Sequence, residues 1–234
     1  MMDPSSEDYP RFRPVADVGV MVEFAQSISE AANDAVLALD AALRGDPFSG
    51  FTEAVPAYCS LFVGYDPLVA EPDAVRAHVR RLWAGTQVHA PEGRVWEVPV
   101  CYDPPFAPDL AAVAERTRLT PEAVIEAHLK GRYRVYMYGF APGYAYLGGV
   151  PEAIRLPRKP EPVRDIPAGS VSIAGPQSLV STMIMPTGWW VIGRSPARIL
   201  RPHHEVPFLF EVGDRVMFRR IAATEFQALS EGSA

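Results

Sequence analysis

The sequence predicts an α+β protein in two parts: a small split βαβ domain of the ferredoxin-like type, followed by a β-barrel or sandwich. Strand and helix patterns alternate in the first part. Helical spacing stops after Gly131, and short strand patterns separated by Gly and Pro replace it. Most of the 24 prolines lie after residue 98, which marks the change in build.

In the first part, VGVMVEF at 18–24 predicts the opening strand. The alanine- and leucine-rich segment 25–43 predicts a helix that ends before Gly45. The aromatic and β-branched stretch 55–65 predicts a strand, paired with a short one near Phe51. Residues 72–84 predict a second helix with a proline in its first turn, which completes the split βαβ order.

In the second part, HAPEGR at 89–94 predicts a linker, and RVWEVPVCY then begins a strand. Two short helices are expected near 108–117 and 121–129, the second with Thr120 as N-cap and Gly131 as its stop. The later strands are expected in YRVYMYGF, SVSIAG, LVSTMIM, WWVIGRS and DRVMFRR. We therefore expect a flexible arm at 1–17, domains at 18–90 and 91–222, and a C-terminal tail at 223–234.

The composition restricts the possible functions. A net charge of −6 and a pI near 5.4 argue against a nucleic-acid partner, which requires a basic face. No stretch reaches the apolar length that spans a bilayer, and the polar N-terminus lacks the apolar run of a secretory signal. Cys59 and Cys101 lie in apolar, strand-like runs, which predicts buried thiols in a reducing compartment. The expected location is cytoplasmic, with no membrane partner.

The segment 138–149 is the densest candidate for chemistry, because its glycines allow close backbone approach and its aromatic side chains offer a flat wall. A tight turn over an aromatic core explains the same composition equally well. The residues expected to bind substrate here are Tyr138, Phe140, Pro142, Gly143 and Tyr144.

Two further segments carry polar candidates. The proline-rich segment 156–170 holds Arg158 and Arg164 for an anion and Ser170 as an orienting group, although it could equally be a rigid surface crossover. Gln177 could hydrogen-bond an amide, and Arg194 follows a strand-like run and could bind an anion. We assign Arg158, Arg164, Gln177 and Arg194 as catalytic candidates. Trp189 and Trp190 should point to opposite faces of a strand, one inward and one outward, in a packing role.

No metal site is predicted. His203 and His204 are adjacent and would point apart, while His78 and His128 lie on predicted helices, at the surface or the edge of the core. The sequence contains no HExxH, CxxC or GxSxG motif. Because no complete nucleophile and base can be identified, we do not expect the chain to be active alone.

Several motifs together resemble a known family. YRVYMYGFAPGYAYLGG, LPR, IPAGSVSIAG and GWWVIGRSP follow one another, after EAVPAYCSLFVGYDP and FAPDLAAVAERTRLTPEAVIEAH. They resemble allophanate hydrolase subunit 1, also known as the 5-oxoprolinase B subunit or KipI, which carries carboxyltransferase subdomains C and D. The resemblance runs from about Val18 to Ile221. It implies a cyclophilin-like barrel as the second domain.

The resemblance also implies a hetero-oligomeric hydrolase. The expected partners are allophanate hydrolase subunit 2, also known as the 5-oxoprolinase C subunit, and a lactam-utilisation subunit. The expected substrate is a small carboxylate or amide, such as 5-oxoproline converted to glutamate, or an allophanate- or urea-type amide. ATP would be bound by or with a partner. The alternatives are a KipI-like inhibitor of a histidine kinase and the carboxyltransferase half of a biotin-dependent, urea-carboxylase-like system.

The chain departs from the family pattern at three places. The family usually reads AGGQTGIYP and SPGGW where this chain reads AGPQSLVST and MPTGW. Pro176 therefore replaces a glycine and removes a backbone N–H, and Thr187 replaces another glycine. Asp165 stands where the family commonly has a polar or basic residue. These departures bear on the choice of substrate. We expect the loops 138–149, 156–170, 175–178 and 186–194 to converge, with Arg158, Arg164 and Arg194 in one positive hollow.

Overall fold

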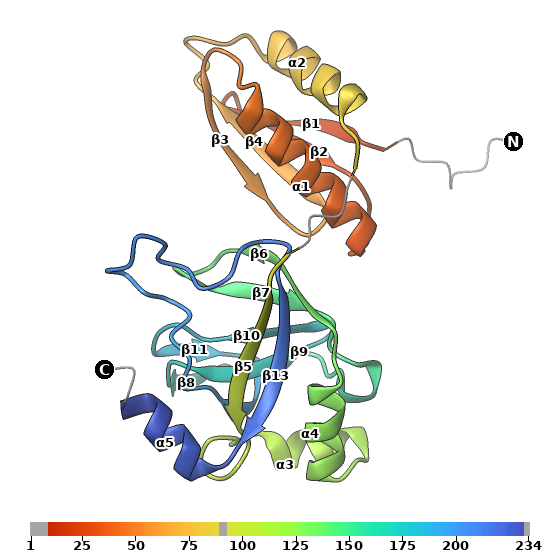
Figure 1. Cartoon of the computed structure of the whole chain (residues 1–234). Coiled ribbons are helices and arrows are strands. Elements are labelled where there is room, and N and C mark those ends of the chain that lie inside the picture. Colours follow the sequence, from red (N-terminus) through yellow and green to blue (C-terminus); the bar gives the residue numbers. More distant parts are fainter. Residues whose placement is uncertain (1–8, 89–92, 232–234) are drawn as a thin grey trace, which may run out of the picture. The chain divides into compact units, whose positions relative to one another are not determined.

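The computed structural model describes residues 9–88 and 93–231 (Figure 1). The chain forms two compact units that divide between residues 92 and 93. Most of the predicted linker, residues 89–92, lies outside the described residues, as do residues 1–8 of the predicted arm and 232–234 of the predicted tail.

The first unit is one antiparallel sheet with two helices. Its strands lie in the order β1-β2-β4-β3. Their bounds are β1 Arg11–Val15, β2 Gly19–Glu23, β3 Phe51–Pro56 and β4 Ser60–Tyr65, with α1 Glu30–Gly45 and α2 Pro72–Gly85. Leu39 and Leu43 of α1 and Val75 and Val79 of α2 pack on Val63 and other apolar residues of the sheet. This packing buries one face of each helix.

The strand pairing contains a split crossover. Strands β2 and β3, joined through α1, each pair antiparallel with β4, which lies between them. The ferredoxin-like form is not confirmed, because the position beside β2 is filled by β1 and not by a strand that follows α2. The prediction of a flexible arm is wrong for residues 11–15. Hydrogen bonding to β2 and packing of Phe12 on the core order this edge strand.

Two elements of this unit have other bounds than predicted, and in each case a side-chain hydrogen bond explains the difference. The predicted strand at 55–65 is a hairpin, because the buried Asn33 side chain donates to the carbonyls of Ala57 and Tyr58 at 3.3 and 3.2 Å and fixes a turn there. Helix α1 starts later than predicted, because the Ser29 hydroxyl caps it by accepting from the Ala32 amide at 3.1 Å.

The second unit is a closed barrel of seven strands in the order β10-β7-β6-β13-β5-β12-β9. The bounds are β5 Val95–Cys101, β6 Tyr133–Tyr138, β7 Ala145–Gly148, β9 Ser170–Ala174, β10 Gln177–Val180, β12 Trp190–Arg194 and β13 Arg215–Ile221. A separate two-stranded antiparallel sheet pairs β8 Val163–Ile166 with β11 Met185–Thr187. The fold is therefore α+β with a closed barrel, as predicted.

Short helices accompany the barrel. They are α3 Leu110–Thr117, α4 Pro121–Leu129, the 3-10 turn η1 Glu152–Ile154 and α5 Ala223–Glu231. Thr120 caps α4 by accepting from the Ala123 amide, as predicted. The prediction of a tail is wrong for 223–231, because Phe226 anchors α5 against Phe106 with ring centroids 4.4 Å apart. None of the described helices is both long and apolar enough to cross a membrane.

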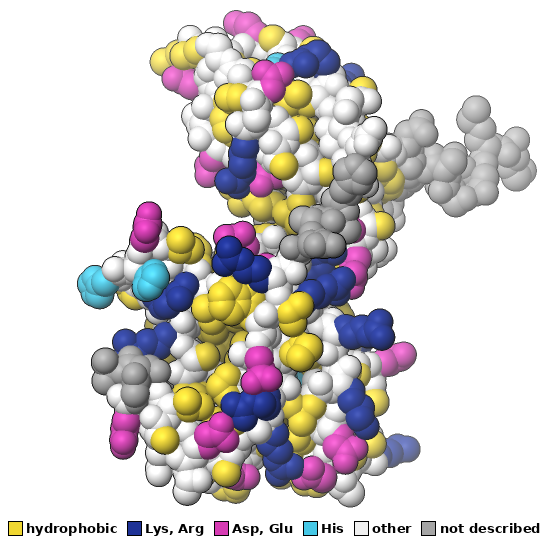
Figure 2. Space-filling view, viewed as in Figure 1, with side chains coloured by type: hydrophobic (Ala, Val, Ile, Leu, Met, Phe, Trp, Pro, Cys, Tyr) yellow, Lys and Arg dark blue, Asp and Glu magenta, His cyan; other side chains and the backbone are white. Residues whose placement is uncertain are grey.

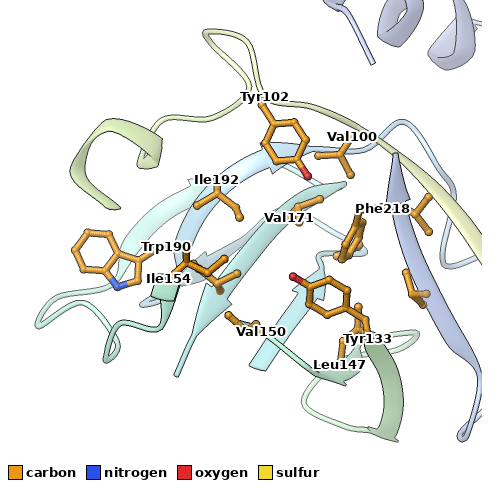
Figure 3. Packing of buried hydrophobic residues seen from close by; sticks show 14 of the residues in the cluster. Val100, Tyr102, Tyr133, Leu147, Val150, Ile154, Val171, Trp190, Ile192 and Phe218 are labelled. Atoms are coloured by element: carbon orange, nitrogen blue, oxygen red, sulfur yellow. The ribbon is translucent and has the colours of Figure 1, made fainter. Parts of the chain in front are cut away.

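The barrel interior is filled by aliphatic and aromatic side chains from all around the sheet (Figure 3). Trp190 belongs to this core. Trp189 is also buried, in a second cluster with Tyr144, Leu179 and Met185, so neither tryptophan faces solvent, although one of them was expected to point outward. Because Met185 comes from the two-stranded β8–β11 sheet, this small sheet covers the part of the barrel on which Trp189 lies.

His128 is fully buried rather than at the surface or core edge, because the face of α4 that carries it packs against β13. Its ring stacks on Phe218 with centroids 4.5 Å apart, and its Nδ1 lies 2.7 Å from the Tyr102 hydroxyl. The Tyr133 hydroxyl donates to the His128 carbonyl at 3.0 Å. Burial lowers the pKa of His128 to about 3, so the ring is neutral in the folded protein near pH 7.

This burial predicts a loss of stability in mild acid. Below the unfolded pKa of about 6.5, the unfolded chain takes up a proton that folded His128 refuses until about pH 3. Between pH 7 and pH 5 the wild-type protein should lose about 2 kcal/mol more unfolding free energy than His128→Asn, which has no titrating ring. Urea titrations of both proteins at the two pH values measure the difference. Equal losses in the two proteins would contradict the prediction.

Candidate functional site

A cavity of about 510 Å³ opens in the barrel unit beside the end of β12. Its lining comes from the loop before β9, the segment after β10, the segment that continues β12, and α5. The lining residues are Ala168, Gly169, Ser181, Thr182, Arg194, Ser195, Pro196, Ala197, Arg198, Ile199, Leu200, Phe226 and Ser230. Two arginines and four hydroxyl residues are included, but no Asp or Glu, so the described lining favours an anionic ligand.

The positive charge of this cavity is a local feature. On the face of the barrel unit seen in Figure 2, Lys and Arg side chains alternate with Asp and Glu around exposed hydrophobic ones. The whole chain carries a net charge of −6. A lining with two guanidinium groups and no carboxylate therefore differs in sign from the protein as a whole, which is the arrangement that attracts a small anion.

The guanidinium of Arg194 is held on two sides. Its Nε donates to the Ala168 carbonyl at 3.0 Å, and its central carbon lies 5.7 Å from the centroid of the Phe226 ring. The hydrogen bond to Ala168 uses the Nε donor and leaves the two terminal guanidinium nitrogens, Nη1 and Nη2, to bind a ligand. The contact with Phe226 also orients the guanidinium, because a cation is attracted to an aromatic face.

A second, smaller cavity of about 240 Å³ also includes Arg194 in its lining. Its other lining residues are largely apolar: Pro105, Phe106, Pro108, Ile166, Pro167, Ser170 and Val191. Arg194 thus stands between a polar hollow and an apolar one. A ligand with a carboxylate and a small apolar body matches this pair of environments.

Gly169 shapes the floor of the larger cavity. Its backbone has φ +81°, its amide donates to the Ser181 carbonyl at 2.7 Å, and its carbonyl accepts from the Ser195 amide at 2.8 Å. A Cβ at this position would lie only 2.3 Å from the Ser195 carbonyl oxygen. Glycine is therefore required by both the backbone angle and the close approach of the Ser195 segment.

Gly169→Ala should force the Ser195 segment away and open the floor. We expect a loss of about 2–4 kcal/mol in unfolding free energy, because a positive φ and a backbone clash act together. Urea unfolding gives the magnitude, and Gly175→Ala serves as the control, since that glycine also has positive φ but open space where a Cβ would lie. An equal effect at both positions would show that the backbone angle alone matters.

Four predicted site residues meet at the larger cavity or beside it. Arg194 lines it, and buried Ser170 lines the smaller cavity next to it, with its hydroxyl donating to the Pro167 carbonyl at 2.8 Å. Pro142 and Gly143 reach its rim. The Pro142 carbonyl accepts from the Thr182 hydroxyl at 2.8 Å, and a Cβ on Gly143 would come within 3.1 Å of Leu200.

Three other predicted residues belong to a separate group. Phe140 and Tyr144 form, with Tyr146 and Trp189, what we call the aromatic row, in which successive ring centroids are 5.5, 5.5 and 6.0 Å apart. The guanidinium carbon of Arg158 lies 5.7 Å from the Trp189 ring. Burial raises the pKa of Tyr144 to about 12, while the charge of Arg158 acts in the opposite direction. The aromatic row is thus a series of packed rings with the Arg158 guanidinium at its Trp189 end.

The remaining predicted residues lie elsewhere. Tyr138 donates its hydroxyl to the Phe210 carbonyl at 2.7 Å and stacks on Phe208, which is a packing role. Gln177 begins β10 opposite Gly148 and Ala174. Arg164 is exposed on β8 and is absent from the described lining of both cavities.

The expected convergence of three arginines is therefore wrong. Arg158 lies beside Trp189, just before β12, whereas Arg194 ends that strand. Of the three arginines, only Arg194 is among the described lining residues of the two cavities. Sequence analysis also missed Arg198, Thr182 and Phe226. The run RSPAR could have indicated Arg198, but nothing in the polar segment 223–234 marked Phe226 as a wall.

The family departures do not touch the larger cavity. The Pro176 carbonyl accepts from the Gly149 and Val150 amides in the β9–β10 turn, and the Thr187 hydroxyl accepts from the Trp189 amide. Asp165 lies on β8 with φ +55°. None of these three residues is among the described lining residues, so the substitutions leave the cavity's charge unchanged.

The described residues offer no other evident reactive centre. Among them, no group of three or more His, Cys, Asp or Glu side chains could hold a metal ion. Cys59 and Cys101 are free thiols, and burial raises the pKa of both. A raised pKa keeps a thiol protonated near pH 7, so neither side chain is poised as a nucleophile.

The barrel fold and the family match together place the chain in the class of carboxyltransferase-type domains. The family described as carboxyltransferase domain, subdomain C and D, matches residues 10–210, and the chain belongs to that family. It is 40% identical to the 5-oxoprolinase B subunit of Bacillus subtilis (strain 168) over 94% of this chain and 96% of the relative. It is 34% identical to the protein of that name from Escherichia coli O157:H7, over 87% of this chain and 93% of the relative.

A solved structure supports the fold over most of the chain. The urea amidolyase of K. lactis superposes with a TM-score of 0.79, covering 97% of this chain and 16% of that longer one. At 14% identity, this likeness concerns the fold alone. Helix α5 follows the residues matched by the family, so Phe226 and Ser230 are cavity walls that lie beyond the family match.

Proposed function

We propose that this chain is the B subunit of a 5-oxoprolinase-type enzyme, an ATP-dependent amidohydrolase that converts 5-oxoproline to glutamate. It would act with a C-type partner and a lactam-utilisation subunit. The relatives named as 5-oxoprolinase B subunits, which match over nearly their whole length, support the proposal. The observation that carries it furthest is the cavity around Arg194, lined by two arginines and no described carboxylate.

In this proposal Arg194 and Arg198 bind the carboxylate of the substrate. 5-Oxoproline combines a carboxylate with a compact lactam ring, and the two hollows that meet at Arg194 offer an anion site and an apolar site. The chain's own part is therefore to bind and orient the substrate, and to keep its negative charge paired while the ring is opened.

The N-termini of α2 and α3 are unfavourable sites for the phosphates of ATP. A helix binds phosphate through its exposed N-terminal amides, but the N-cap residues of α2 and α3 are the acidic Glu71 and Asp109, which would repel a phosphate. The Asp109 carboxylate is already used by the Lys159 ammonium and the Val191 amide, at 2.8 and 2.7 Å. We therefore assign ATP to a partner.

Neither the kinase-inhibitor function nor the biotin-dependent one is supported by a specific contact in the described residues.

The proposal predicts a strong effect of Arg194→Ala in the reconstituted complex. Loss of a charge-assisted contact to the substrate carboxylate should lower kcat/KM for 5-oxoproline by about 10- to 100-fold. Glutamate release in the presence of ATP is the readout. The matched control is Arg164→Ala, which removes an exposed arginine that lines neither cavity.

Arg164→Ala should retain kcat/KM to within about twofold, because surface substitutions away from a site have small effects. The isolated chain should release no glutamate, since a complete nucleophile and base are not found among its described residues. Full activity of Arg194→Ala in the complex would refute the role of the cavity. Turnover by the isolated chain would refute the division of labour between subunits.

A further inference from the structure

Phe140 combines two features that folding alone does not explain. Its side chain is 76% exposed, and its backbone has φ +70°. The Ala141 amide donates to the Gly139 carbonyl at 2.9 Å, which closes a three-residue turn centred on Phe140. Turns of this kind with positive φ are strained, and glycine would adopt the angle without steric cost. A bulky aromatic residue here indicates a role outside the fold.

The turn that presents Phe140 is held firmly. The Gly139 amide donates to the Tyr144 carbonyl at 3.2 Å, and the Tyr144 amide donates to the Ala141 carbonyl at 3.1 Å. The Thr182 hydroxyl, from the segment after β10, donates to the Pro142 carbonyl at 2.8 Å. The exposed ring is therefore carried by a short, fastened turn, which lowers the entropy lost when it is buried by another molecule.

The segment fastened to this turn adds further apolar surface. Met183 and Ile184 follow Thr182 directly, and Ile184 is 70% exposed. We define the apolar rim as Phe140, Pro142, Met183 and Ile184. It adjoins the larger cavity, because Thr182 is one of the cavity's lining residues. A clustered group of this kind beside a ligand site is typical of a protein contact surface.

The side of the rim that adjoins the cavity is positively charged. Arg198 is exposed and lines the adjoining cavity, which has no described acidic lining residue. A partner suited to this surface therefore carries an apolar socket bordered by Asp or Glu side chains.

A second copy of this chain is a poor occupant. A two-fold contact through the rim would bring the same patch of each copy together. This would bring the two cationic cavities, each with Arg198 in its lining, close together, and like charges oppose association. The charges favour a different, acidic protein.

We propose that the apolar rim is the docking surface for the companion C-type subunit, whose acid-bordered socket takes the Phe140 ring and covers the mouth of the cavity. This inference rests on the proposed function, which supplies the companion. To the proposed function the inference adds two things: the surface of this chain that binds the C-type subunit, and the kind of side chains, apolar with an acidic border, that the C-type subunit must contribute.

The test measures binding of the purified C-type subunit from the same genome to this chain by calorimetry, without substrate or ATP. Phe140→Gly and Ile184→Ser should each weaken binding by about tenfold or more, as expected for central apolar contacts. Leu68→Ser is the matched control, since Leu68 is 94% exposed but lies in the other unit, and its affinity should stay within about twofold. Arg198→Gln, which removes the positive charge of the adjoining cavity lining, should weaken binding and reduce its dependence on salt.

The stability of Phe140→Gly separates docking from folding. Glycine relieves the backbone strain, so the midpoint of thermal unfolding should stay equal or rise while affinity falls. If the wild-type chain fails to bind the C-type subunit, the proposed function fails and this inference with it. If the wild-type chain binds but both rim variants bind equally well, only the docking surface is wrong. The docking proposal would also be overturned if the wild-type chain self-associates and Phe140→Gly abolishes this association, because the apolar rim would then bind a second copy.

Discussion

The barrel depends on the closure between its first and last strands. Strands β5 and β13 run parallel, with residues 95–101 opposite 215–221, so the pairing joins segments about 120 residues apart. The Asp214 carboxylate anchors this closure. It accepts from the Arg94 amide at 2.8 Å, the Trp96 indole at 2.7 Å and the Glu211 amide at 2.8 Å. Because Asp214 is buried, loss of the carboxylate would leave three donors without their acceptor, and such donors are costly in a dry interior.

The cavity is a consequence of this closure. Pairing of β12 with β5 sets Arg194 opposite Cys101, and pairing of β5 with β13 sets Ile221 opposite the same residue. Helix α5 follows at once, so Phe226 reaches both Phe106 and the guanidinium of Arg194. Helices α3, α4 and α5 gather at the end of the barrel where β5 and β13 finish (Figure 1). The arginine is thus held by groups that only a closed barrel brings together.

The sequence predicted the parts of the structure that local signals specify. Thr120 and Pro121 fix the start of α4 within one turn, and the Gly/Pro-bounded apolar runs mark the barrel strands. Tertiary contacts decided the rest. Asn33 turns a β-branched run into a hairpin from 24 residues away, and one aromatic side chain, Phe226, orders a segment of tail-like composition. The candidate site was likewise predicted only in part, because tertiary contacts decide which candidate residues come together. The composition identified the arginines as candidates, but it could not show which of them line one cavity. The fold decides this, because Arg158 lies beside Trp189, just before β12, and Arg194 ends β12.

The turn at 139–143 links the two groups into which the predicted site divides. On one side Gly143 contacts Thr182 and Leu200 of the cavity wall, and on the other Phe140 begins the aromatic row. A protein seated on the rim would therefore press on a turn that already forms part of the cavity edge. Covering the mouth would exclude water from Arg194 and Arg198, and charge interactions strengthen as the surroundings become less polar. Arg198 is exposed and Arg194 half-buried in this chain, so solvent screens their charges. In the proposed assembly, the cavity would reach its full electrostatic strength only when the second subunit covers its mouth.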